Sequence, residues 1–441
     1  MSTGIANFTV ADVKFASFFT LFANAFSAGM MFLASIFISR YAGKELFGFF
    51  SVILGFIVIG MNGATLGLDA TMVRFIPQYR TENRADAVAA LQRYALFSSF
   101  GIALTAGAII ALLLVYNRGY EWPSAIFAGG CLPVAAGVLI LQAIMRADRN
   151  VIKAVFSEAV IRPIVFLSLL AFFYLYLGSH LDLEAIVGSY FLALIIALIT
   201  AIILVVYGQH VRCSSFFSNS DREVGRWMGV GFSFLLSSFS IALINQTSVV
   251  VSGVVLSAFD AGEFGAALRL AMLAAFALNA VNSVITPFLS RAGASGNHDE
   301  LQALVTRATA FGLVFAVPVC LGFLVLSSDL LTMFGKNYGA SADILRILII
   351  GYGLQAACGP AHSLLAMTGY HYLSAKILAV IASLSVIGII VSMPFYGLMS
   401  GAVITALAVV IYPVIMVAVC RRKLGIDPSI LSLSGLFKTS R

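Results

Sequence analysis

The chain has 441 residues, of which 61% are hydrophobic and 10% are charged, and its mean hydropathy is +1.02. Because soluble domains carry about 25% charged residues on surfaces that face water, this composition excludes soluble enzymes, soluble nucleic-acid binders and secreted disulfide scaffolds. The formal net charge of +7 fits a membrane protein whose cytoplasmic loops are rich in Lys and Arg, so we expect no nucleic acid among its partners.

Long apolar stretches follow one another along the whole chain. A helix that crosses the hydrocarbon core needs about 20 residues, and the first stretch is too long for the core of a cleaved signal peptide. The fifth is long enough only when it is extended backwards through Glu158 and Arg162. The last is long enough to fold back near Pro394 and Gly397, so we predict an all-α integral membrane protein with twelve spans. In chain order, the stretches are 15–39, 46–68, 94–116, 122–145, 163–179, 185–209, 227–259, 270–290, 308–328, 347–370 and 377–420.

The basic residues are distributed unequally between the two sides of the membrane. Nineteen of the 26 Lys and Arg residues fall on the side of the N-terminus, and the other seven fall on the opposite side or inside the spans. Such an excess marks the cytoplasmic side. An even number of spans then places both termini in the cytoplasm.

A short repeat divides the chain into two halves. Gly43–Gly48 after the first span is similar to Asp260–Gly265 after the seventh. Because the copies are six spans apart, the halves insert the same way up and are related by a pseudo-twofold axis along the membrane normal. Two six-helix lobes that face a central cavity are suited to alternating access, so transport is the leading function. The predicted parts are an N-terminal lobe (1–207), a cytoplasmic interlobe linker (208–226), a C-terminal lobe (227–420) and a cytoplasmic tail (421–441).

Several short motifs resemble those of a known family. Arg40–Phe49, Gly67–Tyr79 and Leu331–Gly339, together with Gly359-Pro360 and Thr368-Gly369, resemble Wzx-type polysaccharide flippases of the multidrug/oligosaccharidyl-lipid/polysaccharide (MOP) exporter superfamily. This resemblance implies a V-shaped pair of six-helix lobes around a cationic cavity. It also implies a function in surface polysaccharide biosynthesis.

The activity that the resemblance implies is the transfer of an undecaprenyl-diphosphate-linked oligosaccharide from the inner to the outer leaflet of a bacterial cytoplasmic (inner) membrane. The implied partners are the lipid-linked oligosaccharide, membrane lipids, and the polysaccharide polymerase and chain-length machinery. We expect no cofactor and no metal.

Two arginines inside the predicted spans are the first candidates for substrate binding, because a charge at a helix centre costs about 2.5 to 3.5 kcal/mol on insertion scales. If the fifth helix begins near Ala154, Arg162 lies about 12 Å inside it. Glu158, four residues earlier, offers an ion pair. Arg162 is therefore either on the cavity wall facing a phosphate or in a structural pair. Arg269, about a turn and a half into the eighth helix, has no acid within four residues, so it either extends to the interface or binds a ligand phosphate.

Other polar residues are candidates with a structural alternative. Arg74, Arg80 and Arg291 at the cytoplasmic ends of the second and eighth helices suit first capture of a diphosphate, although the positive-inside bias also explains them. Arg40 is an interfacial anchor or a substrate ligand.

The polar amides within the spans have two interpretations as well. Asn245 and Gln246 in the seventh span, and Asn24 in the first, bind sugar hydroxyls or form interhelical hydrogen bonds. Glu158 and Asp69 are the candidates for ion coupling, and Asp69 is also a possible partner of Arg74.

Three other functions compete with a flippase. A drug or cation antiporter of the same superfamily would use acidic residues in the N-terminal lobe, but the first span, 15–39, contains none. A membrane-embedded glycan polymerase or glycosyltransferase would need a catalytic constellation outside the spans, and we find none in the sequence, so we predict that the chain is not an enzyme. A scaffold without transport stays open.

Overall fold

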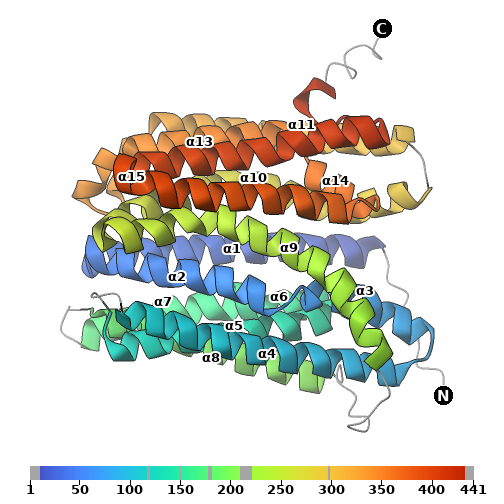
Figure 1. Ribbon diagram of the computed structural model, residues 1–441, viewed down its shortest axis with the longest axis horizontal. Helices are drawn as coiled ribbons and strands as arrows, with labels where there is room; N and C mark the ends of the chain where they lie inside the picture. Colours follow the sequence, from blue (N-terminus) through green and yellow to red (C-terminus); the bar gives the residue numbers. More distant parts are fainter. Residues whose placement is uncertain are drawn as a thin grey trace.

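The computed structural model describes residues 10–116, 120–148, 150–176, 181–208, 221–295 and 298–432, which are α-helical with short connections. The long helices run nearly parallel in two groups, one above the other in Figure 1. One group contains α1 (Val10–Tyr41), α2 (Lys44–Ala64), α3 (Leu68–Thr81), α4 (Ala85–Tyr116), α5 (Trp122–Ala147), α6 (Val151–Phe156), α7 (Arg162–Tyr176) and α8 (Leu183–Tyr207). The other contains α9 (Asp221–Val251), α10 (Ala258–Ser295), α11 (His298–Val325), α12 (Ser327–Thr332), α13 (Ala342–Ala357), α14 (Ala361–Met367) and α15 (His371–Leu424).

The number of membrane helices agrees with the sequence. Among the described residues, ten helices are long and apolar enough to cross a membrane. The last of them, α15, is divided at Gly397, whose φ of 62° and ψ of −156° are not helical. A side chain would disfavour this backbone conformation, which glycine adopts freely. With the second arm of α15 and with α10, the number of spans reaches the predicted twelve.

The fifth span also has the predicted extension. It runs from Val151 to Tyr176 and contains a π-helical turn, η1 (Ser157–Ile161), immediately before Arg162. It begins three residues earlier than Ala154, so Arg162 lies eleven residues from its first residue, or about 16 Å along the axis. Arg162 is therefore deeper than the sequence indicated.

The second predicted span is shorter than expected because the chain turns after it. The helix ends at Ala64, and Leu66 and Gly67 have φ values of 52° and 68° before α3 begins. A β-carbon on Gly67 would lie 2.1 Å from the carbonyl oxygen of Gly231 on α9. Only a residue without a β-carbon fits at this close approach, which joins the turn of the first lobe to the beginning of the second lobe.

The beginning of α9 packs against helices of both lobes. The side chain of Trp227 is buried, and its Nε1 donates a hydrogen bond of 2.9 Å to the Tyr79 hydroxyl on α3. Figure 1 shows this part of α9 crossing from the second group of helices towards α3. Of the predicted linker, residues 209–220 lie outside the described residues.

The two copies of the sequence repeat meet where α2 packs against α10. A β-carbon on Gly48 would lie 1.7 Å from the Ala258 carbonyl oxygen, and one on Gly262 would lie 2.5 Å from the Lys44 carbonyl oxygen. Small residues permit such close helix packing in membranes, where dispersion contacts replace the hydrophobic effect. The repeat therefore marks a direct contact between the lobes.

Candidate functional site

A cavity of about 410 Å³ lies between the two lobes. Helices α1 and α2 form its wall on one side, and α9, α10 and α13 form the other. Most of the lining side chains are apolar, among them Met31, Phe32, Leu54 and Met272. We call this space the interlobe cavity.

Arg269 is the one charged side chain among the described residues that line the interlobe cavity. It lies eleven residues after Ala258, the first residue of α10, which is three turns and about 16 Å along the helix. The expected depth of a turn and a half was wrong because α10 begins earlier than the apolar stretch indicated. Arg269 is therefore deeper within its helix than the sequence indicated.

The surroundings of Arg269 are aromatic. Its guanidinium carbon lies 4.9 Å from the ring centroid of Phe47 and 6.0 Å from that of Phe50, both on α2 of the other lobe. No carboxylate pairs with it among the described residues. The face of an aromatic ring attracts a guanidinium by about 0.5 to 2 kcal/mol. This attraction does not replace a negatively charged partner, so the cavity is suited to an anion.

Asn245 and Gln246 of α9 line the same cavity. The hydroxyl of Tyr352 on α13 donates a hydrogen bond of 2.8 Å to Asn245 Oδ1, and the Asn245 amide nitrogen is left to donate. Asn24, the third candidate for sugar binding, has an exposed side chain on α1 and is not among the lining residues. Two of the three amides therefore line the same cavity as Arg269.

Arg162 has protein partners inside the N-terminal lobe. Its Nη1 donates a hydrogen bond of 3.0 Å to the Tyr190 hydroxyl on α8, and its Nη2 lies 3.7 Å from Glu158 Oε1. Gln142 Nε2 donates to Glu158 Oε2 at 2.5 Å, and Arg146 Nη2 donates to Gln142 Oε1 at 2.9 Å. Glu158 and Arg162 thus belong to a polar network that spans α5, η1 and α8.

Aromatic rings connect the two arginines. The Arg162 guanidinium carbon lies 5.9 Å from the Tyr190 ring centroid, and the Tyr190 and Phe50 centroids are 5.9 Å apart. The Phe50 centroid in turn lies 6.0 Å from the Arg269 guanidinium carbon. Arg162 is not in the lining of the interlobe cavity, and its role in phosphate binding stays a prediction.

The remaining candidates lie away from the cavity. Arg80 pairs with Asp148 at 2.6 Å, and Arg74 is exposed with its guanidinium carbon 5.8 Å from the Phe75 centroid. Arg291 is on α10, and its side chain lies outside the described residues. The carboxylate of Asp69 interacts electrostatically with Arg146, and no ion pair joins it to Arg74 in the described part of the chain.

A second set of polar contacts joins the lobes at the turn between α1 and α2. Lys44 forms an ion pair with Glu263 on α10, and the Ser341 hydroxyl donates a hydrogen bond of 2.5 Å to Glu263 Oε2. Arg40 Nε donates to the Met333 carbonyl oxygen at 2.6 Å, which agrees with an anchor. Lys44 and Glu263 are not among the candidates predicted from the sequence, although both lie within the repeated motif.

The sequence matches the model of the family described as "Polysaccharide biosynthesis protein" over residues 16–292, well over half of the chain. The chain belongs to this family. A curated relative from Haloferax volcanii, the "probable low-salt glycan biosynthesis flippase Agl15", is 22% identical over 413 residues, which cover 90% of this chain and 81% of the relative.

Solved structures of the MOP superfamily share the fold of this polysaccharide biosynthesis family member. A MOP superfamily transporter from Pyrococcus furiosus, whose binding pocket is described as having reverse polarity, superposes with a TM-score of 0.69 at 14% identity, over 93% of this chain and 95% of its own. An outward-facing multidrug resistance MATE family transporter gives a TM-score of 0.68 at 14% identity, again over 93% and 95%. The resemblance drawn from the short motifs is confirmed for family and fold.

Proposed function

We propose that this chain is a flippase that moves a glycan linked to polyprenyl diphosphate across the membrane, and that Arg269 binds the diphosphate in the interlobe cavity. The observation that carries the proposal is a guanidinium three turns inside a membrane helix, without a carboxylate partner among the described residues, in a cavity between two lobes. An uncompensated charge inside a membrane span is costly. A bound anion compensates it.

The chemistry of Arg269 suits a phosphate. A guanidinium presents a planar fork of N–H donors that forms paired, charge-assisted hydrogen bonds with phosphate oxygens. Phe47 and Phe50 flank the group, and their ring faces attract the cation without supplying competing hydrogen-bond acceptors. The mostly apolar lining lowers the local dielectric constant, which strengthens the interaction between the two charges.

The glycan part of the proposal is supported by the family and by the relative from Haloferax volcanii, which is described as a probable glycan flippase. The neighbouring amides Asn245 and Gln246 can donate to and accept from sugar hydroxyls. We infer that the carrier is undecaprenyl diphosphate and the location a bacterial cytoplasmic membrane, with both termini in the cytoplasm. The polysaccharide polymerase and chain-length machinery remain the expected partners.

The membrane potential can supply the direction of transport. With the N-terminal side in the cytoplasm, a head group of about two negative charges moves outward with a gain of about 4 to 5 kcal/mol per 100 mV. The lobes would rock between two states as the contacts between Lys44 and Glu263 break and reform. If the flipping rate does not respond to an imposed potential, Glu158 or Asp69 becomes the candidate for coupling to protons or sodium.

A drug or cation antiporter has the same fold, but the charge in the cavity favours an anion. Among the described residues that line the interlobe cavity, none is acidic, so a cationic drug would meet the guanidinium of Arg269 without a compensating carboxylate. Uptake of a fluorescent cation into proteoliposomes would support the antiporter.

The test is a flipping assay in phosphatidylethanolamine/phosphatidylglycerol proteoliposomes with undecaprenyl diphosphate that carries one radiolabelled sugar. We expect Arg269→Gln to lower the initial flipping rate at least tenfold. Arg346→Gln is the matched control, because Arg346 is half-exposed and pairs with Asp343, and it should stay within twofold of the natural sequence. If Arg269→Gln flips the lipid at the same initial rate as the natural sequence, Arg269 does not bind the diphosphate.

A further inference from the structure

A second, smaller chamber opens within the C-terminal lobe. Its volume is about 170 Å³, more than ten times the roughly 10 to 15 Å³ that a single water needs. Helices α9, α10, α13, α14 and α15 enclose it. We call it the side chamber.

The side chamber exists because the tenth membrane helix is broken between α13 and α14. Gly359 has a φ of 61°, and a β-carbon there would lie 2.1 Å from the Pro428 carbonyl oxygen and 2.2 Å from Thr309 Oγ1. Pro360 follows and lacks the N–H that a continuous helix would use. His362 and Ser363 of α14, directly after the break, line the chamber.

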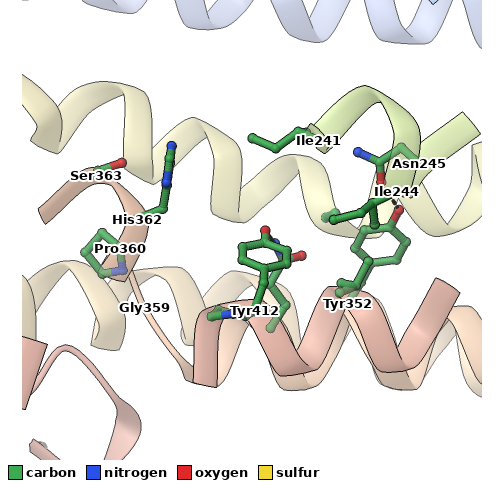
Figure 2. A pocket seen from close by; sticks show the side chains of 13 residues that line it. Ile241, Ile244, Asn245, Tyr352, Gly359, Pro360, His362, Ser363 and Tyr412 are labelled. Carbon is green, nitrogen blue, oxygen red and sulfur yellow. Dashed lines mark hydrogen bonds between the residues drawn. The ribbon is translucent and has the colours of Figure 1, made fainter. Parts of the chain in front are cut away.

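The lining of the side chamber combines apolar side chains with six polar ones, and none of its residues is acidic, Lys or Arg. Figure 2 shows the contact between Asn245 and Tyr352 at one end, His362 and Ser363 at the other, and Tyr412 between them. Among the thirteen lining residues there is no Asp, Glu, Lys or Arg. An ionic ligand would therefore lack a counter-charge, and a hydrocarbon tail would leave the polar groups unsatisfied.

The polar groups of the side chamber keep unused hydrogen-bonding capacity. Gln355 Nε2 donates to the Tyr412 hydroxyl, which leaves the Gln355 carbonyl oxygen and the Tyr412 proton available. His362 Nδ1 is bonded to Ser374 Oγ at 2.8 Å, so its Nε2 is available on the chamber side. Sugar hydroxyls both donate and accept, and they match such a mixture of amide, phenol and imidazole groups.

The side chamber adjoins the interlobe cavity. Asn245, Ala275 and Tyr352 belong to the lining of both spaces, and Arg269 lies on the far side of this shared wall. In a lipid-linked glycan the first sugar is bonded directly to the diphosphate, so a phosphate at Arg269 would have that sugar as its neighbour in a cavity that Asn245 and Tyr352 also line.

We propose that the side chamber binds the diphosphate-proximal sugar of the glycan as a neutral subsite next to the anion site. This inference rests on the proposed function, because the position of the phosphate at Arg269 sets the position of the sugar. Tyr412, Gln355 and His362 would then contribute to the choice of that sugar, and Arg269 would bind any polyprenyl diphosphate.

The test compares two probes on the purified full-length chain: farnesyl diphosphate, and farnesyl diphosphate that carries one N-acetylglucosamine or one glucose. We expect at least one sugar-bearing probe to bind at least fivefold more tightly than farnesyl diphosphate. Tyr412→Phe combined with Gln355→Leu should abolish this difference and leave the affinity for farnesyl diphosphate within twofold. Tyr372→Phe is the control, because Tyr372 is an exposed tyrosine on the same helix.

The outcomes separate the two proposals. Equal binding of all probes to the natural sequence, or a sugar preference that survives in the double variant, would overturn the side chamber as a sugar site. Absence of farnesyl diphosphate binding, or binding that Arg269→Gln does not weaken, would instead overturn the proposed function, and the subsite with it. Tyr412→Phe alone, which keeps the ring, provides the same comparison if the double variant does not fold.

Discussion

Arg162 and Arg269 lie at similar distances from a helix end, eleven residues from Val151 and from Ala258, and yet their surroundings differ. Arg162 has a carboxylate and a phenol as partners within its own lobe. Arg269 meets two aromatic rings of the opposite lobe and a cavity. The comparison teaches that an arginine in a membrane span is a ligand candidate when the protein itself supplies no counter-charge, and a structural group when it does.

The largest expected effect concerns the stability of the Arg162 network. Arg162→Leu leaves Glu158 partly buried without its counter-charge, so we expect a loss of about 3 kcal/mol in the free energy of unfolding. Thermal unfolding in detergent and denaturant titration would measure it. The double variant Glu158→Gln with Arg162→Leu removes both charges and should recover most of the lost free energy of unfolding. If Arg162→Leu alone unfolds like the natural sequence, the network is not structural.

The same measurement on Arg269 sharpens the comparison. Arg269→Leu removes a charge that has no carboxylate partner among the described residues, so we expect unchanged or higher stability without substrate. If Arg269→Leu instead lowers the free energy of unfolding by more than about 2 kcal/mol, Arg269 makes an interaction within the protein that outweighs the cost of burying its charge.

The next largest effect, on the affinity for farnesyl diphosphate, depends on the planar shape of the Arg269 guanidinium. Arg269→Lys keeps the charge but replaces a planar fork with a point charge, so we expect roughly tenfold weaker binding of farnesyl diphosphate, about 1.4 kcal/mol. Equal affinities would mean that Arg269 contributes charge alone.

The ion pair between Lys44 and Glu263 gives a smaller effect at the same lobe boundary. Lys44→Met and Glu263→Gln should each destabilise the contact between the lobes by about 1 to 2 kcal/mol, and the double variant should lose less than the sum of the two. Cysteine crosslinking between α2 and α10 would measure the fraction of molecules in which the lobes separate. Additive losses would show that the two residues do not act as a pair.

The smallest effect is expected for Arg346, which is half-exposed and pairs with Asp343. Exposed pairs contribute about 0.2 to 1 kcal/mol, so Arg346→Gln should change the unfolding temperature little, and less at high salt. If Arg346→Gln lowers the free energy of unfolding as much as Arg162→Leu does, buried and exposed ion pairs contribute equally to the stability of this protein.

The spans could be predicted because each depends on local composition. The apolar stretches, the turn at Gly397 and the extension through Glu158 and Arg162 follow from hydropathy and from glycine and proline. The breaks at Gly67 and Gly359 were missed because they depend on the close approach of Gly231 and of Pro428, which are far away in the sequence.

The site was predictable only in part. That Arg269 has no acid within four residues is visible in the sequence, and the structure places it in the interlobe cavity. The contact of Arg162 with Tyr190 and that of Lys44 with Glu263 join residues 28 and 219 positions apart. No periodicity or motif specifies such pairs, because they depend on how helices pack. The broken helix that forms the side chamber is similarly invisible to a search for apolar stretches.

The most direct test of the account is the affinity for farnesyl diphosphate measured on two variants of comparable stability, Arg269→Gln and the double variant Glu158→Gln with Arg162→Gln. We expect the affinity to fall at least tenfold in Arg269→Gln and to stay within twofold in the double variant. The reverse pattern would place the anion site in the N-terminal lobe and contradict the assignment of Arg269.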